Sequence, residues 1–141
     1  LIIPCWVHIS LVDIEGDVSK MMVQEVNLPI TNALYAAPTG VEAERDENDI
    51  VTVSWDTVWM TEDDDRGYLI EAWLCQDGQI VFTPIGVPSN VQAVKVTDEP
   101  GCLEPSGARV YTAEKHGYTQ WRKASWPAFE TRIGAADAAL H

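Results

Sequence analysis

Most of this chain consists of short apolar segments that alternate in side-chain character and are separated by turn-forming residues. No stretch carries the long 3.6-residue apolar period of an amphipathic helix. Short alternating segments between turn signals are typical of antiparallel strands. They follow one another as Ile50–Val58, Gly67–Cys75, Ile80–Ile85, Val91–Val96, Ala108–Gly117 and Tyr118–Trp126. The pattern predicts an all-β, antiparallel sandwich of about seven strands.

The segment Gly67–Cys75 differs from its neighbours because both of its faces are apolar. Only Glu71 interrupts the face that carries Leu69, Trp73 and Cys75. A strand with one face in water should alternate more cleanly than this. We therefore expect protein outside the sandwich to cover the second face. Either the ends of the same chain or a neighbouring subunit would do so.

Charge and composition restrict the partners of the chain. The 141 residues carry 22 acidic and 9 basic side chains, a formal net charge of -13, without a basic patch. Such a surface repels phosphate backbones and anionic lipids, so we expect no nucleic-acid partner. No apolar run approaches the roughly 18 residues of a membrane span. High acidity, few lysines and abundant tryptophan favour an exported protein, outside the cell or on its surface. Because the chain starts at Leu1, we expect a processed chain or a fragment.

The residues that usually carry catalysis are sparse. The three histidines are His8, His116 and His141, and their spacing resembles no zinc site. No phosphate-binding glycine loop or nucleophile elbow is present. Two acidic clusters, 62–65 and 46–49, raise the question of calcium, but neither has the spacing of an EF-hand loop. We read them as solvated loops and expect no enzyme activity, metal site or cofactor.

Several short motifs occur in order along the chain: Pro38, Val41 and Ala43, then Val51, Val53 and Trp55, then Tyr68 and Ile70, and finally Val110 with Ala113 and Gly117. Together they resemble a fibronectin type III domain over Ala37–Trp126. The resemblance implies a seven-stranded sandwich for residues 37–127, an N-terminal extension at 1–36 and a C-terminal tail at 128–141. It also implies a core that contains Val51, Val53, Trp55, Tyr68, Ile70 and Val110.

The resemblance also gives the cysteines a partner. Cys75 would end the third strand, and Cys102 would lie in the loop before the neighbouring sixth strand. A Cys75–Cys102 disulfide is therefore favoured over two separate buried thiols. Cys5 would remain unpaired.

The N-terminal extension contains another alternating run, which we call the arm (residues 5–14). It has no place in a seven-stranded sandwich and predicts an extra strand. The first functional hypothesis is a structural protein outside the cell, a subunit of a filament or surface layer in which the arm adds to a sheet edge of the next copy. Whether the arm packs on its own domain or on a neighbour stays open. The residues expected in this contact are Cys5, Trp6, Val7, Ile9, Leu11, Leu69 and Trp73.

The alternative hypothesis is a binding or spacer module. Fibronectin type III domains of this kind occur beside the catalytic domains of secreted hydrolases and in adhesins. Exposed Trp59, Trp73 and Trp121 would then form a row that stacks on sugar rings or contacts a protein.

Overall fold

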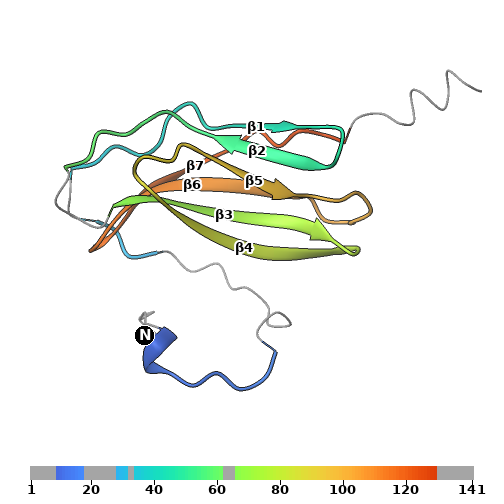
Figure 1. The fold of residues 1–141 in the computed structure, drawn as a ribbon, viewed down its shortest axis with the longest axis horizontal. Helices are drawn as coiled ribbons and strands as arrows, with labels where there is room; N and C mark the ends of the chain where they lie inside the picture. Colours follow the sequence, from blue (N-terminus) through green and yellow to red (C-terminus); the bar gives the residue numbers. More distant parts are fainter. Residues whose placement is uncertain (1–8, 18–27, 32–33, 62–65, 130–141) are drawn as a thin grey trace, which may run out of the picture.

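Two antiparallel sheets pack face to face in the computed structural model, which describes residues 9–17, 28–31, 34–61 and 66–129 (Figure 1). One sheet has the order β1-β2-β5, and the other has the order β4-β3-β6-β7. The predicted all-β class with seven antiparallel strands is therefore confirmed. The elements are the short 3-10 helix η1 (Ile9–Leu11), then β1 (Glu42–Arg45), β2 (Ile50–Ser54), β3 (Gly67–Gln76), β4 (Gln79–Pro88), β5 (Ala93–Thr97), β6 (Gly107–Glu114) and β7 (Gly117–Lys123).

The strand order gives a fibronectin type III-like sandwich. The fourth strand, β4, pairs with β3 in the four-stranded sheet. In immunoglobulin constant domains the fourth strand instead belongs to the sheet that contains the first, second and fifth strands. The β3–β4 hairpin turns at Asp77 and Gly78, whose φ angles of 51° and 77° lie in the left-handed region. An Asp-Gly pair is suited to this turn because both residues tolerate positive φ. Pro84 lies on β4, an edge strand, where a missing N–H is tolerated.

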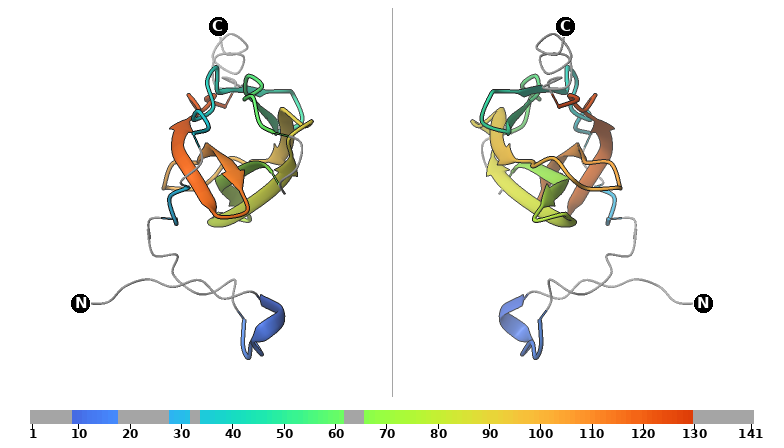
Figure 2. Two further views of the ribbon diagram at one scale, coloured as in Figure 1. Left: turned by 90° about the vertical axis from the view of Figure 1, so that its left-hand side faces the viewer. Right: turned by 90° about the vertical axis from the view of Figure 1, so that its right-hand side faces the viewer.

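The core lies between the two sheets (Figure 2). The Trp55 and Tyr68 rings pack at 5.2 Å between centroids, and the Tyr68 hydroxyl accepts a hydrogen bond from the Val58 N–H at 2.9 Å. This bond satisfies the polar end of a large buried ring. All six residues that the sequence places in the core are buried: Val51, Val53, Trp55, Tyr68, Ile70 and Val110.

A buried ion pair closes one end of the sandwich. Arg45, at the end of β1, donates from Nη2 to the Asp98 Oδ2 at 2.7 Å, and both side chains are almost fully buried. Arg45 also donates to the Pro127 carbonyl and stacks on the Phe129 ring. The segment after β7 is therefore attached to the sandwich as far as Phe129.

The N-terminal extension meets the opposite end of the sandwich. Ile30 forms an isolated parallel bridge with Tyr118, at the start of β7. The Thr31 N–H donates to the Tyr118 carbonyl at 2.9 Å, and the Tyr118 N–H donates to the Pro29 carbonyl at 2.8 Å. Glycine at position 117 permits this approach, since a Cβ there would lie 2.6 Å from the Pro29 oxygen.

The expected extra strand in the extension is corrected by the structure for the residues it describes. Ile9–Leu11 is the 3-10 helix η1, and residues 12–17 have no strand conformation. Alternation alone does not make a strand, because a strand needs a partner for its backbone groups. Residues 9–17 lie apart from the sandwich in Figures 1 and 2. Cys5, Trp6 and Val7 fall outside the described residues.

Candidate functional site

The second face of β3 is the outer face of the four-stranded sheet. Leu69 and Trp73 are half-buried there, and Glu71 is buried. The strand register places Phe82 of β4 beside Trp73, Arg109 of β6 beside Glu71, and Tyr111 of β6 beside Leu69. Large side chains from neighbouring strands therefore cover much of the apolar face that raised the question of an outside partner.

Arg109 is the centre of this face. Its guanidinium carbon lies 4.9 Å from the Trp73 ring centroid, 5.2 Å from that of Trp121 and 5.7 Å from that of Tyr111. Arg109 Nε donates to a Glu71 carboxylate oxygen at 3.0 Å, and the Tyr111 hydroxyl donates to the same oxygen. We call these five residues the Arg109 cluster. Cation–π contacts of this kind contribute about 0.5–1 kcal/mol each at exposed sites.

The Arg109 cluster also holds its tyrosine in the protonated form. Burial raises the pKa of Tyr111 above its ordinary value, and the hydrogen bond to Glu71 and the negative charge of that group raise it further. The Arg109 charge opposes this shift but does not reverse it. The Tyr111 hydroxyl therefore stays protonated and donates to Glu71 at neutral pH and above.

A groove of ≈ 510 Å³ lies beside the Arg109 cluster. Trp73 and Ile80 form its apolar side, and residues 104–107 form its far wall, including the acidic Glu104. Trp121 also lines it, and this residue is 44% exposed. Arg109 and Lys123, which face each other across β6 and β7, contribute its two basic groups. The groove can hold a segment that is both apolar and acidic.

The disulfide that the resemblance implied is present between Cys75 and Cys102, with 5.9 Å between their Cα atoms. Cys75 is buried at the end of β3, and its N–H donates to the Asp98 Oδ1 at 2.8 Å. Cys75 is therefore part of the covalent framework of the sheet and offers no free thiol on its outer face.

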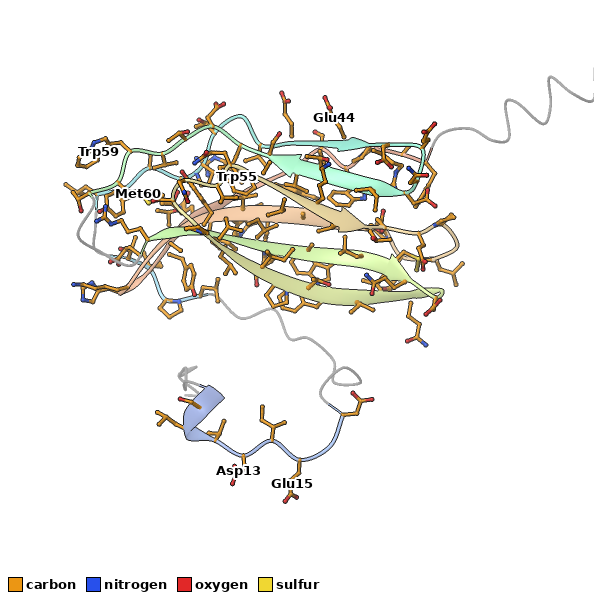
Figure 3. All side chains as sticks on the ribbon, in the orientation of Figure 1. Asp13, Glu15, Glu44, Trp55, Trp59 and Met60 are labelled. Atoms are coloured by element: carbon orange, nitrogen blue, oxygen red, sulfur yellow. A yellow bond between two sulfur atoms is a disulfide. The ribbon has the colours of Figure 1, made fainter. Side chains whose placement is uncertain are left out.

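The arm exposes its apolar side chains. Leu11 is 76% exposed, Val12 43% and Ile14 51%. Asp13 lies within the same stretch and Glu15 directly follows it, and Figure 3 shows both side chains pointing away from the sandwich. Ile9 lies in η1, and Cys5, Trp6 and Val7 lie outside the described residues.

The three tryptophans expected to form a row are divided between two places. Trp73 and Trp121 share Arg109, and Trp73 also packs on Phe82 with 5.3 Å between ring centroids. Trp59 follows β2 and lies at one end of the molecule (Figure 3). Its ring packs edge-on against the Tyr35 ring, with 6.4 Å between the ring centroids. The three rings therefore do not form one continuous stacking platform.

His116 and Asp46, two residues of types that often serve in catalysis or metal binding, form hydrogen bonds within the sandwich. His116 lies in the β6–β7 turn with its Nδ1 at 3.2 Å from a Glu114 carboxylate oxygen. Asp46 accepts hydrogen bonds from the backbone N–H groups of Asn48 and Ile50, as a turn-forming aspartate does.

Neither a metal site nor a membrane-spanning helix is found within residues 9–17, 28–31, 34–61 and 66–129. No group of three His, Cys, Asp or Glu in these ranges could hold a metal ion, and no helix in them is long and apolar enough to cross a membrane. His8, His141 and the acidic cluster 62–65 lie outside this part of the chain.

Sequence reasoning missed the charged half of the Arg109 cluster. Glu71 is the one charged residue of β3, and Arg109 is the one charged residue of β6 before Glu114 at its end. A pair of such exceptions on strands expected to be neighbours is a signal for a cross-strand ion pair. Using the signal requires the register, which places Glu71 directly opposite Arg109.

Comparison with known proteins gives little beyond the fold. No protein-family model matches this sequence, and no curated protein matches it. Among solved structures, the chain is similar to "a Fn3-like protein from Clostridium thermocellum", at 14% sequence identity and a TM-score of 0.41. The similarity covers 70% of this chain and 99% of that one. At this level the likeness carries no argument about function.

Proposed function

We propose that this chain is a non-enzymatic, fibronectin type III-like subunit that assembles with copies of itself into a filament or layer outside the cell. The observation that carries the proposal is the exposed apolar arm. Leu11, Val12 and Ile14 all stand in water beside a sandwich whose own core is filled. Contiguous exposed apolar side chains are typical of interaction surfaces, since removing them from water is favourable by about 25 cal/mol per Å².

An arm that binds a different surface on the next copy makes a heterologous contact. Such contacts extend into open filaments unless the rotation between subunits closes a ring. Strand addition to a sheet edge is one way to form the contact, and it would require η1 to unwind when the arm binds. The Cys75–Cys102 disulfide supports an exported location, because disulfides persist mainly in oxidising compartments.

The test is a double substitution in the arm, Leu11→Asp with Ile14→Asp. We expect the wild-type mass in light scattering to rise with concentration far above the 15.6 kDa of one chain, with open assemblies in negative-stain microscopy. The double variant should stay at the monomer mass and keep its unfolding midpoint in urea. The matched control is Leu34→Asp, a fully exposed leucine outside the arm, which should assemble normally. A wild-type chain that is monomeric at every concentration would refute the proposal.

A second candidate function, a glycan- or protein-binding spacer module, is supported by exposed tryptophans. Trp59 is 74% exposed, and Trp121 is exposed at the rim of the groove. Such rings stack on sugars or anchor protein partners. This candidate predicts a stable monomer that binds an oligosaccharide or protein, with binding lost in Trp121→Ala or Trp59→Ala. The mass measurement above therefore distinguishes the two functions.

A further inference from the structure

The groove beside the Arg109 cluster is unusual for this molecule because it brings together two basic residues, Arg109 and Lys123, against one acidic residue, Glu104. The chain as a whole has a net charge of -13, with only nine basic residues. Two of these nine, Arg109 and Lys123, line one groove from facing positions on β6 and β7. Arg109 is paired with Glu71, whereas Lys123 is exposed and has no ion-pair partner in the described part of the chain. An occupant with carboxylates would satisfy Lys123.

The groove is also apolar on the side of Trp73 and Ile80, and Trp121 stands exposed at its rim. A purely acidic loop would leave these surfaces in water. The best-matched occupant is a short segment that carries apolar and acidic side chains in close succession.

The arm, together with Glu15 directly after it, has this chemistry. Leu11, Val12 and Ile14 supply exposed apolar side chains, and Asp13 and Glu15 supply carboxylates between and after them. All five residues lie within one stretch that is exposed throughout. In an extended segment Val12 and Ile14 share one side, and Leu11, Asp13 and Glu15 share the other. Val12 and Ile14 can therefore face the aromatic rings while the two carboxylates, beside Leu11, reach a lysine at the rim.

We propose that the groove between the Arg109 cluster and residues 104–107 is the receptor for the arm of a second copy of this chain. The inference rests on the proposed self-assembly and names the surface that the arm binds. Apolar arm residues pack against Trp121 and the Trp73 side of the groove. The carboxylates of Asp13 and Glu15 pair with Lys123. Glu104, which also lines the groove, repels these carboxylates and so disfavours positions close to it.

The position of the arm favours a second copy over the same chain. The arm residues that the structure describes lie apart from the sandwich in Figures 1 and 2, and none of them lines the groove. The groove is therefore open to the arm of a neighbouring copy.

The experiment is a charge-reversal cycle on the full-length chain, read out as the concentration at which light scattering detects assembly. Lys123→Glu should raise that concentration roughly tenfold or more, because it replaces an attraction by a like-charge repulsion. Asp13→Lys and Glu15→Lys should have similar effects. Combining Lys123→Glu with one of the two arm reversals should restore most of the loss. Unfolding midpoints in urea verify that each variant remains folded.

The matched control is Lys95→Glu, the same charge change at an exposed lysine of β5 on the other sheet. If Lys123→Glu and Lys95→Glu weaken assembly equally, or if no arm reversal rescues Lys123→Glu, the groove is not the receptor. Should Leu11→Asp with Ile14→Asp still abolish assembly in that case, self-assembly through the arm stands and only the receptor assignment fails. A monomeric wild type refutes both.

Discussion

At the scale of single residues, the Asp98 carboxylate is fully buried and accepts hydrogen bonds from four different residues. Its Oδ1 accepts hydrogen bonds from the Cys75 N–H and the Ser106 hydroxyl, and its Oδ2 accepts them from Arg45 and from Trp126 Nε1 at 3.0 Å. One fully buried side chain thus joins β1, β3, the loop before β6 and the segment after β7. Breaking a buried ion pair by removing one charge typically costs about 3–5 kcal/mol.

We expect Asp98→Asn to lower the free energy of unfolding by roughly 3–5 kcal/mol at pH 7, because Arg45 stays buried without its counter-charge. Urea denaturation measures this loss. The control is Asp77→Asn, an exposed turn residue at positive φ, where asparagine is well tolerated. Equal unfolding midpoints for the two variants would show that the ion pair contributes little.

The same carboxylate should make the protein sensitive to acid. Burial raises the pKa of Asp98, but the hydrogen bonds from Arg45, Ser106, Cys75 and Trp126 together hold it below its ordinary value. A pKa that is lower in the folded than in the unfolded state gives stability that is present above the unfolded value of about 3.9. That stability is lost as the pH falls through the folded pKa. The unfolding midpoint of the wild type should therefore fall more steeply below about pH 4 than that of Asp98→Asn.

Individual residues show what sequence can and cannot predict. The core was predictable because burial requires apolar side chains at alternate positions, and Val51, Val53 and Trp55 show the pattern openly. The Arg45–Asp98 ion pair was not predictable, because it depends on the fold bringing the end of β1 next to the end of β5. Fifty-three positions separate them along the chain. Polar networks of this kind leave no local periodic signal.

At the scale of elements, the extension is held to β7 by a close backbone contact at Gly117. Residues 29–31 add hydrogen bonds on the outer side of β7, and the Thr31 hydroxyl donates to the buried Glu114 carboxylate. Burial raises the pKa of Glu114, but hydrogen bonds from Thr31 and His116 outweigh it and lower the pKa. Part of the extension therefore belongs energetically to the sandwich.

We expect Gly117→Ala to detach residues 29–31 from β7, because the new methyl group would overlap the Pro29 carbonyl oxygen. Amide hydrogen exchange should become faster at Thr31 and Tyr118 while the β3 amides stay protected. Gly86→Ala on β4 is the control, since a Cβ there meets nothing within 4 Å. Unchanged exchange at Thr31 in Gly117→Ala would mean that the contact is looser than the structure indicates.

Elements were predictable where a turn signal separated them. The Asp77–Gly78 pair predicts the β3–β4 hairpin. An alternating segment on each side of a turn signal predicts the β6–β7 hairpin in the same way. The arm shows the limit of this reasoning. Its alternation resembles that of a strand, but pairing is a property of two segments, and the structure gives residues 9–17 no partner strand within the described chain.

At the scale of the whole molecule, one disulfide links the loop before β6 to β3. Cys75 and Cys102 are separated by 27 positions, and closing a loop of this size stabilises a fold by on the order of 3 kcal/mol in the chain-entropy model. The bond lies beside Asp98, because Cys75 itself donates to that carboxylate. The covalent and the ionic cross-link therefore reinforce the same end of the sandwich.

We expect a reducing agent to lower the free energy of unfolding of the wild type by roughly 3 kcal/mol, measured in urea with and without dithiothreitol. Cys102→Ser without reductant should match the reduced wild type, and reductant should not change it further. If reductant still lowers the midpoint of Cys102→Ser, another bond is the one that stabilises the fold.

The positions at which the chain enters and leaves the sandwich have a mechanical consequence. Residues 29–31 meet it at the β6–β7 turn, and residues 124–129 leave it beside Asp98, at the other end of the strands (Figure 1). If the arm of one copy occupies the groove of the next, tension would enter a subunit at residues 29–31 and leave it at Trp121 and Lys123, further along β7. It would therefore run along β7 and its neighbouring strands. The hydrogen bonds of these strands would be loaded in shear, so they must break together and not one after another. Forced unfolding is governed by the unfolding rate, and a subunit loaded in this way would resist pulling for longer than one that is peeled open from an edge.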